Sequence, residues 1–283
     1  MSKNRKDGRR VEIPGLMQCC IDLKPKRYEN EVYINRDMDV TALSEYLNGK
    51  KQLGIRYTYF IAFLTATAKV IFNRPKMNRF IKNRHLYEHN TVSLAFVAKM
   101  SLNDVSEEIM LIVDVAPEDT IETISEKVKA KVENLRGKEV KKAGANSAID
   151  ILGKLPNIIR VPIFGIIKWL DKKGLLPSSL SKDNIYFSSM IISNLGSIRC
   201  GAIYHNLAEF GTSSSLASMG EIRSVKSDDG SIKQLCEFGI TLDERIADGY
   251  YFAKSCKMIE YVLKNPEMLE ECASAPINMP ELI

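Results

Sequence analysis

Apolar residues recur every three or four positions between Tyr57 and Phe72, which predicts an amphipathic helix there. Phe60, Leu64 and Ala68 share the apolar face, and Pro75 lies just past its end. The same spacing, with breaker residues at the ends, predicts further helices over 41–48, 120–137 and 248–264.

A different period, apolar and polar in alternation, marks the strands. Val92, Leu94 and Phe96 fall on one face of a strand over 91–100. Other strands are predicted at 31–35, 80–87, 109–115, 185–193, 215–225 and 234–242, with turns at His89-Asn90 and Asp228–Gly230. Helices and strands mix without a strict strand-helix-strand repeat, so the predicted fold class is α+β with a mostly mixed sheet.

Residues 147–180 break this pattern with a 13-residue apolar stretch over 158–170 that holds two charges and the only tryptophan. The stretch is too short to span a bilayer. It could lie on a membrane surface or against a protein partner, so a peripheral membrane or protein contact through 151–170 is open. Packing on the domain itself or on a sister subunit is the simpler prediction.

The 283 residues suffice for one large domain or two small ones. The net charge is only +5, and basic residues cluster before position 11. No zinc-finger spacing or aromatic-basic signature occurs, so no nucleic-acid partner is expected. We predict a basic flexible tail over 1–27, a main domain over 28–270 that includes the 147–180 insertion, and a C-terminal tail over 271–283.

Six cysteines without a C-x-x-C pair indicate a reducing compartment, and the first 20 residues hold no continuous apolar stretch. The expected location is therefore cytoplasmic. His85 and His89 are four residues apart but fall in a strand and a turn, so no metal site is expected.

Two segments carry chemistry. Ser193-Asn194-Leu195-Gly196 ends an apolar strand, and Asp243-Glu244-Arg245-Ile246-Ala247-Asp248-Gly249 lies between a strand and the last helix. Together they resemble the catalytic domain of the dihydrolipoamide acyltransferases of 2-oxo acid dehydrogenase complexes, whose fold chloramphenicol acetyltransferase shares. The family signatures are Ser-Asn-Leu-Gly and Asp-His-Arg-x-x-Asp-Gly. With weaker matches at 32–47 and 75–78, the resemblance covers about residues 28–270.

The resemblance implies an α+β, chloramphenicol acetyltransferase-like two-layer sandwich with a mixed sheet that assembles as a homotrimer, with active sites between subunits. It implies transfer of an acyl group from acyl-coenzyme A (acyl-CoA) to a thiol, hydroxyl or amine, without a metal. Ser193 would stabilise the oxyanion, and Asp248 would anchor the loop, commonly through an arginine. Gly249 would make a tight turn, and Asn194, Gly196 and Gly249 would take coenzyme-binding positions. Without the resemblance, Ser193 is a strand-end serine and Asp248 an N-cap.

Glu244 replaces the histidine that acts as base in the family. Reference pKa values of about 6.5 for histidine and about 4.3 for glutamate make proton removal from a thiol harder for glutamate by about 3 kcal/mol. Burial could raise the glutamate pKa and remove this penalty. Asp243 beside it could be buried in an ion pair.

Two alternatives remain open at this residue. His205, twelve residues after Ser193, is a second candidate base from a neighbouring loop. In the other alternative the chain is a catalytically inactive trimeric scaffold or regulatory subunit, a pseudoenzyme of the same fold.

Overall fold

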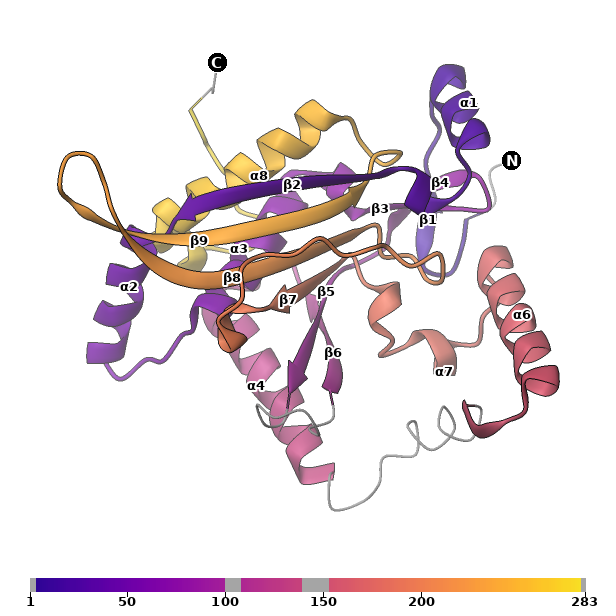
Figure 1. Ribbon diagram of the computed structural model, residues 1–283, viewed down its shortest axis with the longest axis horizontal. Helices are drawn as coiled ribbons and strands as arrows, with labels where there is room; N and C mark the ends of the chain where they lie inside the picture. The colour runs from indigo at the N-terminus through magenta and orange to yellow at the C-terminus, as the bar shows by residue number, and fades with distance from the viewer. Residues whose placement is uncertain (1–3, 100–107, 139–152, 281–283) are drawn as a thin grey trace.

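The computed structural model describes residues 4–99, 108–138 and 153–280 and has a mixed six-stranded sheet as its main layer (Figure 1). The strands lie in the order β2-β9-β8-β7-β5-β6. β7 is parallel to both of its neighbours, and the other pairs are antiparallel. The strands are β2 (Glu31–Asp39), β5 (Val92–Lys99), β6 (Glu108–Val115), β7 (Met190–Asn194), β8 (Ser215–Lys226) and β9 (Ile232–Asp243). The α+β prediction is confirmed.

Helices pack on one face of this sheet and enclose the main core. They are α2 (Thr41–Gln52), α3 (Tyr59–Asn73), α4 (Ile121–Lys138) and α8 (Gly249–Lys264). In α3 every residue over 61–71 is buried, and Phe63 stacks on Phe238 of β9 with ring centroids 5.5 Å apart. Short 3-10 helices occur at Arg27–Glu29, Pro75–Asn78, Ile185–Phe187, Gly196–Ile198 and Pro266–Glu270.

The described part of the N-terminal segment is ordered, so the predicted flexible tail over 1–27 is wrong for it. β1 (Gly8–Arg10) pairs with β4 (His85–His89), which pairs in turn with β3 (Arg79–Lys82), and α1 (Gly15–Leu23) follows β1. Arg5, Arg9 and Arg10 contact residues far along the chain, which a solvated tail would not do. Arg5 contacts the carboxylate of Asp7 at 2.8 Å, and its Nη1 donates to the backbone oxygen of Asp171 at 2.9 Å.

The described part of the predicted C-terminal tail also packs on the domain. Ala273 and Ile277 are buried. The Ala273 amide donates to the backbone oxygen of Asp119 at 2.7 Å, and the Ile277 amide donates to Asn73 of α3 at 3.0 Å. Residues 271–280 therefore pack against the core of the domain and do not form a separate tail.

Two predicted strands are divided. The 80–87 run is a hairpin, because Asn83 and Arg84 adopt left-handed backbone angles (φ 50° and 64°) and turn the chain between β3 and β4. The predicted turn residue His89 lies at the end of β4 instead. The 185–193 run begins as the 3-10 helix Ile185–Phe187 and becomes β7 only at Met190.

The described part of the 147–180 insertion forms α6 (Asn157–Lys173) and α7 (Ser178–Ser181). Of the α6 side chains, only Asp171 is buried. Its carboxylate lies 2.6 Å from Lys82 Nζ in β3. Burial lowers the pKa of Lys82 to about 8, and the Asp171 charge opposes that shift. The apolar side chains of α6 stay largely exposed, so the predicted packing on the chain's own domain is not observed for them.

Among the described residues, no helix is both long and apolar enough to cross a membrane.

Candidate functional site

Ser193 lies near the end of β7 on the sheet face that points away from the main core. It pairs with Ser218 of β8, which pairs with Gly239 of β9, so these three residues form a row across the sheet. Ser193 is partly buried, and its hydroxyl has no hydrogen-bond partner within the described residues. A hydroxyl without a protein partner, at a partly buried strand end, can donate a hydrogen bond to a developing negative charge.

The residues after Ser193 have structural roles of their own. A Cβ on Gly196 would lie 2.7 Å from the backbone oxygen of Gly220, so glycine allows the chain to pass close to β8. The Asn194 side-chain oxygen is buried and lacks a partner among the described groups. Gly196 therefore has a packing reason to be glycine, and the predicted coenzyme contacts of both residues remain predictions.

Asp243 and Arg245 form a buried two-point ion pair after β9. Arg245 Nε and Nη2 lie 2.8 and 2.7 Å from the two carboxylate oxygens of Asp243. Arg27 Nε approaches the same carboxylate at 3.6 Å, and Arg245 Nη1 donates to the backbone oxygens of Lys24 and Pro25. The predicted buried ion pair of Asp243 is confirmed. It ties the Glu244 loop to the segment before β2.

Glu244, between these two residues, faces the other way. Its side chain is 44% exposed, and Oε1 lies 3.3 Å from Nζ of Lys24, itself 57% exposed. Its backbone amide donates to the Asn30 oxygen at 2.8 Å. An exposed pair of this kind is weak, so Glu244 is a solvent-facing carboxylate within one chain. The burial on which the base role of Glu244 depends is therefore not present within one chain.

Asp248 caps α8 and does not pair with an arginine in the described chain. Its Oδ1 accepts the backbone N–H of Tyr251 at 2.8 Å, as an N-cap aspartate does. Gly249 begins the helix, and its Cβ position has open space around it. The predicted arginine-mediated anchor and tight turn are therefore not observed. The capping interpretation is the one that the geometry supports.

His205 belongs to a segment that crosses the outer face of the sheet. Within it, the Ile203 amide donates to Ser218 Oγ at 3.0 Å, and the Leu207 amide donates to Glu31 Oε1 at 2.6 Å. Tyr204 also bonds Glu31. His205 therefore lies between the Ser193 row and the first residue of β2, and its Nε2 is buried without a described partner. A free ring nitrogen in this position can accept a proton.

Ser193 and Glu244 are far apart within one chain. Glu244 follows Gly239, the residue in the Ser193 row, by five positions, which is about 16 Å along a strand. Two strand spacings add about 10 Å sideways, so the two residues are about 19 Å apart. Catalytic groups act at hydrogen-bond distance, so this pair cannot share one reacting carbonyl within a single chain.

Residues near this row that the sequence did not single out are Tyr33 and Glu31 of β2. The Tyr33 ring covers Gly239, packs edge-to-face on Tyr204 at 5.6 Å, and has a pKa raised by burial and by the Glu237 charge. The polar alternation of β2 is the signal that could have identified this exposed face.

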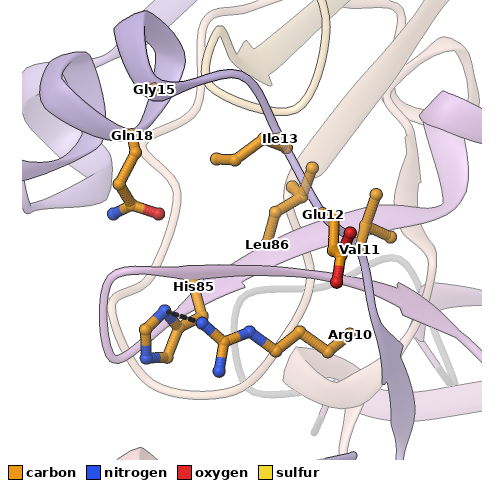
Figure 2. A pocket seen from close by; sticks show the side chains of 8 residues that line it. All are labelled: Arg10, Val11, Glu12, Ile13, Gly15, Gln18, His85 and Leu86. Carbon is orange, nitrogen blue, oxygen red and sulfur yellow. Dashed lines mark hydrogen bonds between the residues drawn. The ribbon is translucent and has the colours of Figure 1, made fainter. Parts of the chain in front are cut away.

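A surface hollow of about 530 Å³ lies elsewhere, between the segment leading into α1 and β4 (Figure 2). Arg10 Nη2 lies 3.0 Å from His85 Nδ1 at its rim, and burial and the Arg10 charge lower the pKa of His85. None of the predicted site residues lines this hollow. It is therefore not the predicted site.

Comparison with known proteins establishes the fold. No protein-family model matches the chain, and no curated protein matches it. Among solved structures, a probable dihydrolipoamide acetyltransferase from Listeria monocytogenes superposes with TM-score 0.57 at 16% identity, over 91% of this chain and 94% of that one. The dihydrolipoamide acetyltransferase of Azotobacter vinelandii gives TM-score 0.57 at 14% identity, over 92% and 93%.

A chloramphenicol acetyltransferase gives TM-score 0.54 at 12% identity, over 91% of this chain and all (100%) of that one. At these identities the likeness shows the fold. The chain thus has the chloramphenicol acetyltransferase-like fold of dihydrolipoamide acyltransferase cores, as the motifs predict.

Proposed function

We propose that this chain is an acyltransferase that moves an acyl group from acyl-CoA to a thiol, hydroxyl or amine. The observation that carries the proposal is the unpartnered hydroxyl of Ser193 at the end of β7, at the Ser-Asn position of a fold shared with acetyltransferases. A fold alone does not fix a reaction, so the site residues must support the chemistry.

In the proposed reaction, a base takes the proton from the acceptor S–H, O–H or N–H. The acceptor atom attacks the thioester carbonyl, and the oxyanion that forms accepts a hydrogen bond from Ser193. The intermediate collapses, the C–S bond breaks, and the coenzyme A thiolate leaves with the proton held by the base. Acyl group, electrons and proton are then all accounted for.

Two bases are compatible with this reaction, and they require different assemblies. His205 lies in the segment bonded to Ser218, next to Ser193, and could act within one chain. Glu244 lies about 19 Å away along the sheet and could act only on a thioester held by Ser193 of another copy. The Glu244 route therefore requires the homotrimer, with each site between two subunits.

A non-catalytic scaffold of the same fold is the second candidate function. The observation in its favour is Glu244 itself, which replaces the family histidine and points to solvent beside Lys24. A trimer that keeps its subunit contacts and lacks a working base would hold partners together instead of turning over substrate.

Calorimetric titration with acetyl-CoA, with light scattering on the same sample, tests the proposal. Micromolar binding by a trimer supports the acyltransferase proposal, and a screen of acceptors would follow. If acetyl-CoA does not bind at millimolar concentration, the non-catalytic scaffold is favoured. A monomer would remove the shared site, and with it Glu244 as a base.

A further inference from the structure

The most exposed apolar surface among the described residues lies on α6, at the edge of the molecule (Figure 1). At 100° per residue, Ile158, Ile159, Ile166 and Trp169 fall within about 100° of the helix circumference. Ile158 is 84% exposed, Ile166 60% and Trp169 54%. Exposed apolar residues scattered singly are ordinary, but a contiguous row on one helix face marks an interaction site.

The charges on this helix have one sign wherever they face solvent. The described segment 153–173 carries Lys154, Arg160, Lys168, Lys172 and Lys173 and a single acid, Asp171. Asp171 is buried and lies 2.6 Å from Lys82. Lys168 and Lys172 follow one edge of the apolar face on the helical wheel, and Lys173 lies within the face at its carboxyl end. The surface that α6 presents is therefore apolar with a cationic border.

The helix is held in a fixed orientation by its carboxyl end. The Asp171 carboxylate accepts the backbone N–H of Gly211 at 3.0 Å, and its backbone oxygen accepts from Arg5 at 2.9 Å. Gly174 ends the helix in the left-handed conformation (φ 71°). The apolar face is thus turned outward by contacts on the opposite side of the helix.

We propose that α6 binds the surface of a membrane that contains anionic lipid, with its apolar face in the headgroup boundary. An apolar face that includes tryptophan, bordered by lysines, matches an interfacial helix. Lysine stems lie along the apolar layer while their ammonium groups reach the phosphates. A twofold contact between two α6 faces would bring two cationic borders together, so like-charge repulsion opposes a dimer through this face. The inference is independent of the proposed function.

Trp169 is the only tryptophan of the 283 residues, so the fluorescence of the unmodified chain reports on α6. We expect its emission to shift to shorter wavelength on adding vesicles of equal parts phosphatidylglycerol and phosphatidylcholine. Binding to pure phosphatidylcholine should be at least about tenfold weaker, because that surface has no net charge and the attraction that each lysine adds at an anionic surface is lost. Added salt should weaken the first binding toward the second.

Matched substitutions locate the contact. Ile166→Asp should weaken binding at least about tenfold, because an apolar side chain is replaced by a repelled charge. Ile232→Asp, at the 67%-exposed position in the β8–β9 hairpin, should leave it unchanged. Lys168→Glu with Lys172→Glu should abolish the preference for anionic vesicles. All these side chains are on the surface, and circular dichroism checks that each variant is folded.

Three results would overturn the proposal. One is emission that does not respond to anionic vesicles. Another is a blue shift that follows protein concentration without lipid, which would assign the face to a second copy. The third is equal weakening by Ile166→Asp and Ile232→Asp, which would place the contact elsewhere.

Discussion

The guanidinium of Arg245 donates two hydrogen bonds to the carboxylate of Asp243, at 2.8 and 2.7 Å, and both side chains are buried. This geometry is the strongest form of protein ion pair. The two residues of the pair flank Glu244 in the sequence. The loop is thus held by two buried side chains, and the side chain between them is exposed to solvent.

Asp243→Asn should destabilise the fold by about 3–5 kcal/mol, because Arg245 and Arg27 would then be buried without their anion. Urea unfolding measures the change. Asp37→Asn is the control, since Asp37 pairs with Arg223 at 3.0 Å on the surface and should cost less than about 1 kcal/mol. Equal losses in the two variants would show that burial does not strengthen the Asp243 pair.

Asp248→Ala should cost about 1 kcal/mol, because the α8 amide of Tyr251 would lose its cap. Asp248→Asn should recover most of this loss, since the amide oxygen can accept the same bond. Thermal unfolding of the two variants distinguishes a cap from an arginine-linked anchor. A loss of similar size in both would point to a required charge at position 248.

Gly211→Ala should be far more damaging than Gly54→Ala, although both glycines have left-handed angles (φ 81° and 82°). At Gly54 the space is open, so only the backbone preference of about 1–2 kcal/mol is lost. At Gly211 the new methyl would overlap the backbone oxygen of Tyr186, which should add about 2 kcal/mol. Chemical denaturation measures the loss of unfolding free energy in the two variants. Equal losses would show that the backbone around Tyr186 moves aside at little energetic cost.

The imidazole of His89 should make stability fall as the pH drops. Burial lowers its pKa from 6.5 to about 4, with Arg27 and Arg5 acting in the same direction and Asp7 opposing. Between these pH values the unfolded chain binds a proton that the folded chain does not, so the contribution is lost as pH falls from about 6.5 toward 4. From pH 7 to pH 5 the loss should be about 2 kcal/mol.

His89→Gln removes this titration, so its unfolding free energy should change less between pH 7 and pH 5 by the same about 2 kcal/mol. Denaturant curves at both pH values measure it. Parallel pH dependence in the two proteins would assign the effect to carboxylates instead.

Ser193→Ala should lower the turnover of acyl-CoA by about a hundredfold to a thousandfold, as loss of an oxyanion donor does. Ser197→Ala is the matched control, because Ser197 lies in the 3-10 helix that follows β7 and bonds only the Asn194 backbone oxygen at 2.9 Å. Steady-state kinetics should show the loss in kcat with little change in KM. Unaltered turnover in Ser193→Ala would exclude the assigned role.

Mixed assemblies then separate the two bases. If Glu244 acts across a subunit boundary, co-expressed Ser193→Ala and Glu244→Gln chains should regain part of the activity that each lacks alone. No recovery, together with an inactive His205→Ala variant, would assign the base to His205.

Periodicity predicted the main strands and helices because apolar residues recur at the period of each element. In α8, for example, Phe252, Cys256 and Ile259 form the buried face. The turn at Asn83–Arg84 was missed since it lacks glycine, the usual signal for left-handed angles. β1 was missed because its stability depends on distant partners, such as the pairing of Arg9 with Glu88.

The candidate site divides in the same way. The N-cap role of Asp248 and the Asp243–Arg245 ion pair are local contacts. The sequence offered the first as the alternative to a loop anchor and the second as one possibility. The contact of Leu207 with Glu31 joins segments 176 residues apart, so no local pattern indicates it. For the same reason, the distance between Ser193 and Glu244 could come only from the strand order.

β7 has a consequence for the order of folding. In the described sheet β7 lies between a β5–β6 ribbon and a β8–β9–β2 ribbon, each of which can pair antiparallel on its own. Parallel pairing of β7 with β5 and β8 joins segments that are far apart along the chain, so we expect β7 to complete the sheet late in folding. The hydrogens of its central backbone amides should exchange with solvent only when the whole sheet opens cooperatively. The strand that holds Ser193 would then be the element that keeps the two halves of the sheet together.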